Sequence, residues 1–182
     1  VNYFEPKESE LKQNIFSTVN GQYISNLSSF NLIGKDMYIV SENTLYLVDV
    51  ETFLKDWELS GFVNAQNCEY AKFDRLYVSD KGESEIKVVD LNTREITAHV
   101  RTGESVNPTE IVLTWERAFV ANSGGEESSD YDSTIVAIDL KEGLAPVNNF
   151  AGNILVDKNP VSLIYNGAMV VLCKGVYDEI DP

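Results

Sequence analysis

Hydrophobic and polar residues alternate in short segments along most of this chain, and the three-to-four-residue spacing of an amphipathic helix is nearly absent. The alternating segments are rich in Val, Ile, Tyr and Phe, and short polar turns separate them. This pattern is typical of half-buried β-strands. We therefore expect an all-β protein, and the regular spacing of the segments calls for a search for internal repeats.

One alternating segment occurs four times. It reads MYIVSEN at 37–43, LYVSDKG at 76–82, AFVANSG at 118–124 and MVVLCKG at 169–175. A second segment follows the first three copies and reads LYLVDVETF at 45–53, IKVVDLNTR at 86–94 and IVAIDLKEG at 135–143. A polar turn and another apolar strand precede each copy of the first segment. Four antiparallel strands in about 40 to 45 residues form the blade of a β-propeller, which is the fold we predict.

An aspartate ends each copy of the second segment: Asp49, Asp90 and Asp139. Such a side chain can accept a hydrogen bond from the backbone N–H two residues further on and so close a tight turn. We therefore expect a structural role for all three aspartates.

The repeat is incomplete at both ends. NYFEPKESEL at 2–11 parallels VVDLNTREI at 88–96, so the chain starts with the third and fourth strands of a blade, and it stops after a second strand. The predicted units are a half blade at 1–27, whole blades at 28–66, 67–107 and 108–159, and a half blade at 160–182. The two halves could close a four-bladed ring, or the chain could be part of a larger propeller. The open strand at each end favours the larger propeller.

Composition limits the partners. With 182 residues, of which 43% are hydrophobic, the chain is long enough for a sizeable core. The 29 acidic and 14 basic residues give a net charge of −15, which excludes sequence-independent binding of nucleic acid or of an anionic membrane and suits a neutral or cationic ligand. No apolar run approaches the roughly 20 residues of a membrane helix, and no signal peptide is visible. Cys68 and Cys173 lie at different phases of the repeat, so we expect two buried thiols rather than a disulfide.

Few residues point to catalysis. His99 is the single histidine, next to a segment that we assign as an outer strand, so a structural role is expected and a multi-histidine zinc site is excluded. The chain has no G-x-S-x-G elbow, no phosphate-binding glycine loop and no cysteine pair at zinc spacing. We predict no catalytic residue and no cofactor. The alternative is a metal-dependent propeller enzyme of the lactonase or lyase type, which would need buried carboxylates or asparagines around an axial metal.

An acidic segment interrupts the third whole blade. Four carboxylates lie within seven residues, at Glu126, Glu127, Asp130 and Asp132, and calcium prefers oxygen ligands of this kind. The spacing does not match an EF-hand loop. We interpret the segment as a solvated loop and keep the four residues as weak candidates for a calcium site.

The blade order places this loop on the same face as the loops that enter each blade, around the mouth of the central channel. We predict that a shallow polar funnel on this face binds a small molecule or a protein. The predicted ligand-binding residues are Ser79, Asp80, Lys81, Asn122, Ser123, Tyr131 and Lys174.

Three stretches carry a family resemblance: LYVSDKGESEIKVVDLNTREI at 76–96, RAFVANSGGEESSDYDSTIVAIDL at 117–140 and NPVSLIYNGAMVVLCKG at 159–175. They resemble bacterial surface propellers related to YncE and the YVTN-repeat proteins, nearest the DUF5074 group common in Bacteroidetes. The resemblance implies about seven blades and an exported protein at the cell surface or in the periplasm of a Gram-negative bacterium, often a lipoprotein whose anchor lies outside this chain. Some related propellers capture corrinoids for outer-membrane transporters, so a corrinoid or an envelope protein is the implied partner.

Overall fold

The computed structural model describes residues 1–104, 106–125, 130–142 and 145–176. Within them, three four-stranded antiparallel sheets are flanked by a two-stranded hairpin at each end. The first sheet contains β3 (Leu27–Ile33), β4 (Asp36–Ser41), β5 (Thr44–Asp49) and β6 (Lys55–Ser60). The second sheet contains β7 (Ala65–Ala71), β8 (Arg75–Asp80), β9 (Glu85–Asp90) and β10 (Glu95–Arg101). The third sheet contains β11 (Pro108–Leu113), β12 (Arg117–Asn122), β13 (Thr134–Glu142) and β14 (Ala145–Leu155).

The N-terminal hairpin is formed by β1 (Tyr3–Glu5) and β2 (Glu10–Lys12), and the C-terminal hairpin by β15 (Pro160–Tyr165) and β16 (Met169–Cys173). Each whole sheet keeps the chain order of its strands, so every turn is a hairpin. The all-β class and the four-stranded antiparallel repeat predicted from the sequence are confirmed.

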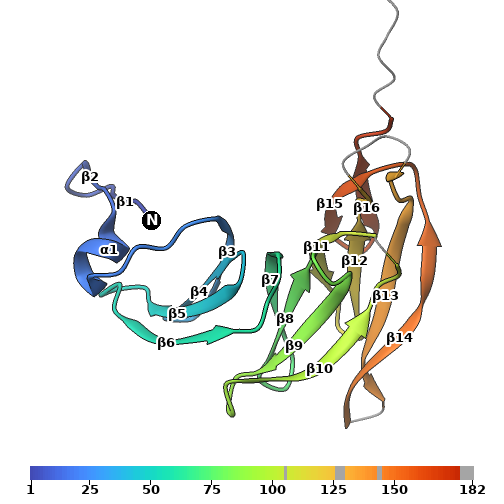
Figure 1. Ribbon diagram of the computed structural model, residues 1–182, viewed down its shortest axis with the longest axis horizontal. Helices are drawn as coiled ribbons and strands as arrows, with labels where there is room; N and C mark the ends of the chain where they lie inside the picture. Colours follow the sequence, from blue (N-terminus) through green and yellow to red (C-terminus); the bar gives the residue numbers. More distant parts are fainter. Residues whose placement is uncertain (105, 126–129, 143–144, 177–182) are drawn as a thin grey trace, which may run out of the picture.

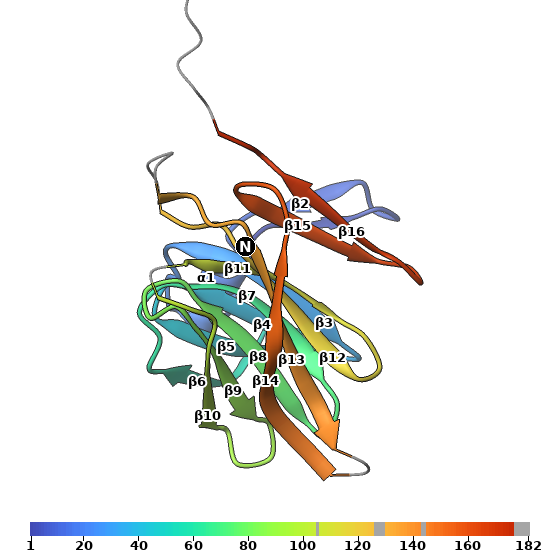
Figure 2. The same cartoon turned by 90° about the vertical axis from the view of Figure 1, so that its right-hand side faces the viewer.

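The sheets follow one another along an open arc (Figure 1). Their first strands lie on its concave side, where β3 contacts β7, β7 contacts β11 and β11 contacts β15. The fourth strands lie on the convex side, and the two hairpins lie at opposite ends of the arc (Figure 1). Seen from one end, the sheets stack face against face (Figure 2).

This stacking explains why the second and third strands read as nearly continuous apolar runs: both of their faces are buried. In β4, Tyr38 and Val40 pack toward the second sheet in a cluster with Cys68, whereas Met37 and Ile39 pack toward the N-terminal hairpin. Equivalent clusters join the second sheet to the third and the third to the C-terminal hairpin. Each fully buried side chain of this size contributes about 1.5–3 kcal/mol, so the contacts between sheets hold the arc together.

Two of the three predicted aspartate turns are present. Asp49 Oδ1 accepts the N–H groups of Glu51 and Thr52 at 3.1 and 2.7 Å, and Asp90 forms the corresponding turn. At Asp139 the expected structural role takes another form than a tight turn: β13 continues past it to Glu142, and its carboxylate accepts a hydrogen bond from Arg117 Nε at 2.7 Å. A facing arginine on the neighbouring strand thus takes the place of the turn.

A short helix, α1 (Ile15–Asn20), lies between the N-terminal hairpin and the first sheet and was not expected. Six residues are too few to show helical periodicity. Phe16 anchors the helix because it is buried against the first sheet. Asn20 also ties it to that sheet, since its side chain donates to the Phe53 carbonyl and accepts from the Lys55 amide, both at 2.8 Å.

An asparagine stands directly before the first strand of every sheet and of the C-terminal hairpin, and sequence patterning did not lead us to predict it. The four residues are Asn26, Asn64, Asn107 and Asn159. Each backbone carbonyl accepts the N–H of the residue that follows the second strand, at 2.9 to 3.1 Å. Three of them have φ between 50° and 58°, a left-handed conformation that asparagine tolerates. This repeated contact fixes where each loop leaves its sheet.

Two buried cations connect neighbouring parts of the arc. Arg75 of the second sheet donates from Nη1 to the Val147 carbonyl at 3.0 Å and from Nη2 to the Leu140 carbonyl at 2.9 Å, both in the third sheet. Lys87, also in the second sheet, donates to the Gly61 carbonyl in the connection from the first sheet at 2.6 Å and pairs with Asp80 at 2.8 Å.

Both cysteines are free thiols in this structure. Cys68 is buried, as expected, and burial raises its pKa, whereas Cys173 is only half-buried, contrary to the expectation of two buried thiols. No helix among the described residues is long and apolar enough to span a membrane.

Candidate binding site on the loop face

Two kinds of loop emerge on one side of the arc: those that join the second and third strands of a sheet, and those that connect one sheet to the next. Antiparallel pairing requires this, since the second strand ends where the first strand begins, as in the pair Asp80 and Ala65. We call this side the loop face. Between the second and third sheets it contains a pocket of about 440 Å³, the loop-face pocket. Its lining residues are Lys81, Gly82, Ser84, Glu104, Val106, Asn107, Gly125, Asp130 and Asp132.

Charge of both signs lines the loop-face pocket. Lys81 contributes an ammonium group, and Glu104, Asp130 and Asp132 contribute carboxylates. The volume falls in the range of small-molecule sites, but the lining is mainly polar. This arrangement suits a polar ligand whose cationic part faces the carboxylates and whose hydrogen-bond acceptors face Lys81.

The base of the acidic loop is closed by its own backbone. Gly125 N–H donates to the Asp130 carbonyl at 2.9 Å, and Asp132 N–H donates to the Ser123 carbonyl at 3.3 Å. Gly124 has φ of +78°, and a Cβ atom there would collide with the backbone of Asp130 and Asp132. Glycine is therefore required at this position. The closure holds Asp130 and Asp132 beside the pocket.

Asp132 is further positioned by the start of β13. Its Oδ1 accepts the Thr134 N–H at 2.7 Å and also the Thr134 hydroxyl. Both of these partners lie at the strand end, so the carboxylate is fixed to the frame of the third sheet. The predicted metal candidates Glu126 and Glu127 lie outside the described residues.

The structure separates the seven predicted ligand residues into three groups: three at or beside the pocket, three buried beneath the loop face, and Lys174 apart from both. Lys81 lines the loop-face pocket, and Ser123 and Tyr131 lie beside it in the acidic loop. Ser123 Oγ donates to the Asn107 carbonyl at 3.2 Å, and the Tyr131 carbonyl accepts from Lys158 Nζ at 2.9 Å. Lys174 is exposed at the end of the C-terminal hairpin and is not among the described residues that line this pocket.

The other three, Ser79, Asp80 and Asn122, are fully buried beneath the loop face. Ser79 Oγ donates to the Thr109 carbonyl of the third sheet at 2.6 Å. Asn122 Nδ2 donates to the Thr102 carbonyl at 3.1 Å and to the Thr134 hydroxyl at 3.0 Å. These hydrogen bonds support the frame beneath the pocket, whereas the buried Asn122 Oδ1 has no hydrogen-bond partner among the described residues.

Asp80 has the most partners of the three. Its carboxylate accepts the N–H groups of Val63 and Asn64, both at 2.9 Å, and pairs with Lys87. Burial alone would raise the pKa of Asp80, but the hydrogen bonds from Lys87 and from the two amides outweigh it and lower that pKa. The pKa of Lys87 is raised in turn: burial opposes this, and the bonds to Asp80 and Glu83 outweigh the burial.

A second polar group lies on the first strands, along the concave side of the arc. Glu69 of β7 lies close to Asn31 of β3, and Glu110 of β11 lies close to Asn67 of β7. Burial raises the pKa of both glutamates, and the charge of Glu110 adds to the shift of Glu69. These carboxyl groups are therefore more easily protonated in the folded chain than in the unfolded chain.

We expect Glu69→Gln and Glu110→Gln to raise the midpoint of thermal unfolding at pH 7. A carboxyl whose folded pKa lies above the ordinary 4.5 stabilises the fold most below pH 4.5, and this contribution is lost as the pH rises through the folded pKa. The neutral amide escapes that loss and retains hydrogen-bonding capacity. Thermal unfolding at pH 4 and pH 7, with exposed Glu95→Gln as the control, measures the effect. Glutamine variants that are no more stable than the parent at pH 7 would contradict it.

His99 lies on the outer strand β10, as expected, and its Nδ1 contacts Glu85 Oε1 at 2.7 Å. Within residues 1–104, 106–125, 130–142 and 145–176, no group of three or more His, Cys, Asp or Glu side chains is arranged to hold a metal ion. The concave polar group brings together two carboxylates with two amides.

Comparison with known proteins finds similarity in fold. No family model and no curated protein sequence matches the chain. Among solved structures, Kuenenia stuttgartiensis hydrazine synthase is similar at 18% identity and a TM-score of 0.71, with 86% of this chain and 47% of that chain covered. The computationally designed Ika8 protein gives 12% identity and 0.66, with 86% and 46% covered.

The WD40 domain of Neurospora crassa Pan2 is similar at 12% identity and a TM-score of 0.53, covering 71% of this chain and 36% of that one. WD40 repeats form propeller blades of four strands, as seen here in the three whole sheets. The fold is that of a β-propeller. Each whole sheet is a blade. The chain covers slightly less than half the length of the hydrazine synthase chain and of Ika8. At these identities the likeness concerns the fold and leaves function to the residues of this chain.

Proposed function

We propose that this chain belongs to a non-enzymatic ligand-binding or protein-interaction propeller and that its ligand binds in the loop-face pocket. The observation that carries the proposal is the pocket itself, in which charged groups from three separate loops converge between two rigid blades. Propellers commonly serve as binding scaffolds, and loops on a rigid frame are where such folds place recognition residues.

The chemistry of the loop-face pocket favours a small polar ligand that carries a cationic group. Three carboxylates face one ammonium group, so the local charge is negative, in the same sense as the net charge of −15. Lys81 would contact an acceptor on the ligand, while Glu104, Asp130 and Asp132 would contact its donors. Ser79, Asp80 and Asn122 would act indirectly, by holding the loops in place.

The resemblance of residues 76–96 and 117–140 to YncE-like and DUF5074 surface propellers suggests a setting. We propose an exported protein of the Gram-negative cell envelope, which touches the membrane only through an anchor outside this chain. A corrinoid is the first small molecule to test, and an envelope protein is the alternative partner.

Titration of cobalamin into the purified chain, followed by calorimetry, tests the site. Lys81→Ala and Glu104→Gln should each weaken binding about 10-fold, because each removes a charged hydrogen-bonding group from the pocket. Glu95→Gln makes the same charge change as Glu104→Gln on the exposed outer strand and should leave binding unchanged.

Two different negative results test the ligand and the site separately. Absence of heat and of any spectral change with the parent chain removes the corrinoid as the ligand. Binding that neither pocket variant weakens removes the loop-face pocket as its site.

A further inference from the structure

A second polar pocket lies between the first and second sheets, on the side of the arc opposite the loop face. Asp36, which begins β4, lies in its wall, at the strand end away from the loop face. The pocket measures about 380 Å³, and we call it the turn-face pocket because hairpin turns of both sheets surround it. Its walls include Asp36, Tyr38 and Trp57 of the first sheet and Asp74, Leu91 and Arg94 of the second sheet and its turns.

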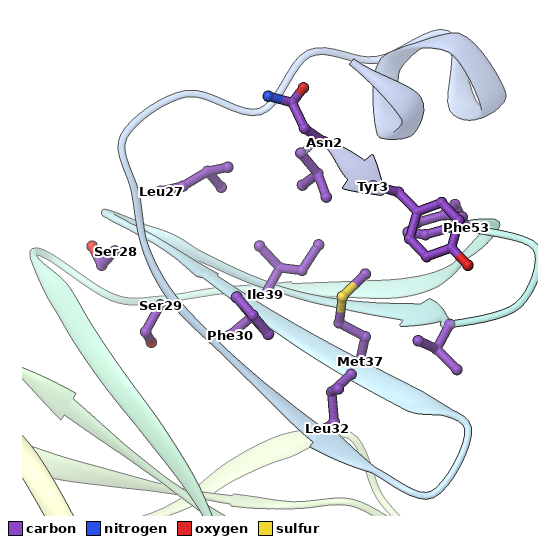
Figure 3. Close-up of a pocket in the computed structure, with 12 residues that line it drawn as sticks. Asn2, Tyr3, Leu27, Ser28, Ser29, Phe30, Leu32, Met37, Ile39 and Phe53 are labelled. Carbon is purple, nitrogen blue, oxygen red and sulfur yellow. The ribbon is translucent and has the colours of Figure 1, made fainter. Parts of the chain in front are cut away.

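The chemistry of this pocket differs from that of the pocket between the N-terminal hairpin and the first sheet. That pocket measures about 360 Å³, with Tyr3 on one side and Leu27, Phe30 and Ile39 on the other (Figure 3). Its lining is mostly apolar, whereas the turn-face pocket combines carboxylates, aromatic rings and an arginine. Convergent polar groups of this kind fix the orientation of a ligand, so the turn-face pocket is the better equipped for specific binding.

The blade repeat shows what the corresponding place holds between the next two sheets. Asp36 and Arg75 are equivalent, because each begins the second strand of its sheet and pairs with the aspartate that ends the third strand, Asp49 or Asp90. The interface between the second and third sheets therefore has an arginine where the interface between the first and second has an aspartate.

The facing backbone is also equivalent in the two interfaces. Leu91 N–H donates to the Asp74 carbonyl, and Leu140 N–H donates to the Glu116 carbonyl, both at 2.8 Å. Arg75 Nη2 donates to the Leu140 carbonyl at 2.9 Å. The Arg75 guanidinium thus fills, between the second and third sheets, the place that corresponds to the turn-face pocket beside Leu91.

A tyrosine borders this place in both interfaces. The guanidinium carbon of Arg75 lies 5.9 Å from the centroid of the Tyr77 ring, and the Tyr77 hydroxyl donates to the Asn148 side chain. Tyr38 is the equivalent of Tyr77, lines the turn-face pocket and is 4% exposed. No group among the described residues forms a hydrogen bond with the Tyr38 hydroxyl. Buried polar groups usually have a partner, so this hydroxyl is available to a ligand.

The charge around the turn-face pocket is negative. Asp36, Asp56 and Asp74 contribute three carboxylates, and Arg94 contributes one cation, which pairs with Asp56 at 2.9 Å. Within the described part of the chain, no lysine, arginine or histidine pairs with Asp36 or Asp74. These two carboxylates are therefore available to a cation that a ligand supplies.

Trp57 forms the outer wall of the pocket. It pairs with Leu47 as Ala98 pairs with Val88 in the second sheet, so an indole ring stands where the next blade has a methyl group. The guanidinium carbon of the half-exposed Arg94 lies 5.8 Å from the centroid of the Trp57 ring. This wall thus already packs one guanidinium at its rim, and aromatic faces attract such cations.

We propose that the turn-face pocket binds a guanidinium group, in the place that Arg75 fills in the next interface. The bound group donates to the carboxylates of Asp36 and Asp74 and lies beside the Tyr38 ring. A guanidinium fits better than an ammonium group because its planar fork reaches several acceptors at once, as Arg75 does with two carbonyl oxygens of the third sheet. The group belongs either to a small molecule or to an arginine side chain of another protein.

Fluorescence of Trp57 tests the proposal directly. The chain has two tryptophans, and Trp115 is 70% exposed, so Trp115→Phe leaves Trp57 as the single reporter without loss of the fold. The probes are a blocked Gly-Arg-Gly peptide, its citrulline and lysine counterparts, and ethylguanidinium, each also titrated by calorimetry. The arginine peptide should bind at least about 10-fold more tightly than the citrulline peptide, which lacks the charge. Equal binding of these two peptides, an arginine peptide no tighter than the lysine peptide, or no response to any guanidinium probe overturns the proposal.

The same titrations distinguish the two sources of the group. An arginine peptide that binds more than about 10-fold more tightly than ethylguanidinium assigns the site to a protein side chain. A smaller difference assigns it to a small guanidinium compound.

Variants of Asp36 locate the binding in the turn-face pocket. Asp36→Asn should weaken binding of the arginine peptide about 10-fold. Asp157→Asn makes the same change at an exposed carboxylate between β14 and β15 and should leave binding unchanged. Asp36→Arg supplies the guanidinium from the chain itself, so it should abolish binding without lowering the midpoint of thermal unfolding. If Asp36→Asn binds as tightly as the parent, the turn-face pocket is not the site.

Arg75→Ala tests the comparison between the two interfaces. This variant empties the place of the guanidinium between the second and third sheets, so millimolar ethylguanidinium should raise its midpoint of thermal unfolding. The rise should exceed that of Arg101→Ala, which keeps the buried Arg75. Equal rises would show that a free guanidinium does not occupy this place, and the proposal for the equivalent pocket would fail with it.

Discussion

Arg75→Ala is expected to lower the free energy of unfolding by about 3–5 kcal/mol, because the change removes a buried guanidinium that joins two blades. Arg75 donates to carbonyl oxygens of Lys72, Leu140 and Val147 and to the Asn148 side chain. Truncation leaves one buried and three partly buried acceptors without their donor. Denaturant unfolding followed by tryptophan fluorescence measures the loss, which is large against the 5–15 kcal/mol typical of a domain.

Two further arginine variants show whether the loss comes from the guanidinium fork. Arg75→Lys keeps the charge but not the fork, so most of the destabilisation should remain. Arg101→Ala removes an exposed arginine from β10 and should change stability by less than about 0.5 kcal/mol. If Arg75→Ala were no more harmful than Arg101→Ala, the contacts between these blades would carry little of the stability.

Asp80→Asn is expected to destabilise the fold by about 3 kcal/mol at pH 7, since it leaves the buried Lys87 without its fully buried carboxylate partner. Glu83, which also pairs with Lys87, is half exposed and offsets part of the loss. The folded pKa of Asp80 lies below 3.8, so its contribution is present above that pH and is lost as the pH falls through the folded value. The gap between the parent and Asp80→Asn should therefore close in acid.

The double variant Asp80→Asn/Lys87→Met provides the control. Because it removes both charges, it should be more stable than the sum of the two single losses predicts, with a coupling energy of about 1–3 kcal/mol. Additive losses would mean that the two side chains act independently, in conflict with their 2.8 Å contact.

The blade repeat could be predicted because it depends on residue patterns within short segments of the sequence. Each second or third strand packs both faces against neighbouring blades, so an apolar run flanked by turns identifies it, and Asp49 and Asp90 mark turns through bonds that span two or three residues. The tight turn expected at Asp139 does not form, because the hydrogen-bond partner of its carboxylate, Arg117, lies on another strand. The contact between Arg75 and Asn148 spans 73 residues, and no pattern in the sequence around either residue predicts it.

The binding site was predictable only in part. Antiparallel order places Lys81 and Asp132 on one face, and the structure brings both into the loop-face pocket. Strand order alone cannot distinguish the exposed Lys81 from its buried neighbour Asp80. In the sequence, a polar residue at a strand end has the same pattern whether its side chain contacts solvent or binds the amides of the adjacent connection. The recurring asparagine before each first strand was the available signal for those connections.

The closure at the loop face has an evolutionary and engineering consequence. The four-residue loop 81–84 and the eleven-residue loop 123–133 leave from equivalent strand ends, with Asp80 opposite Glu85 and Asn122 opposite Thr134. Closing the longer loop costs only about 1 kcal/mol more, since closure entropy grows with the logarithm of length. Foreign peptides grafted between Gly125 and Asp130 would keep the backbone closure and the contact of Asp132 with Thr134, and could be selected for new targets without redesign of the blade beneath them.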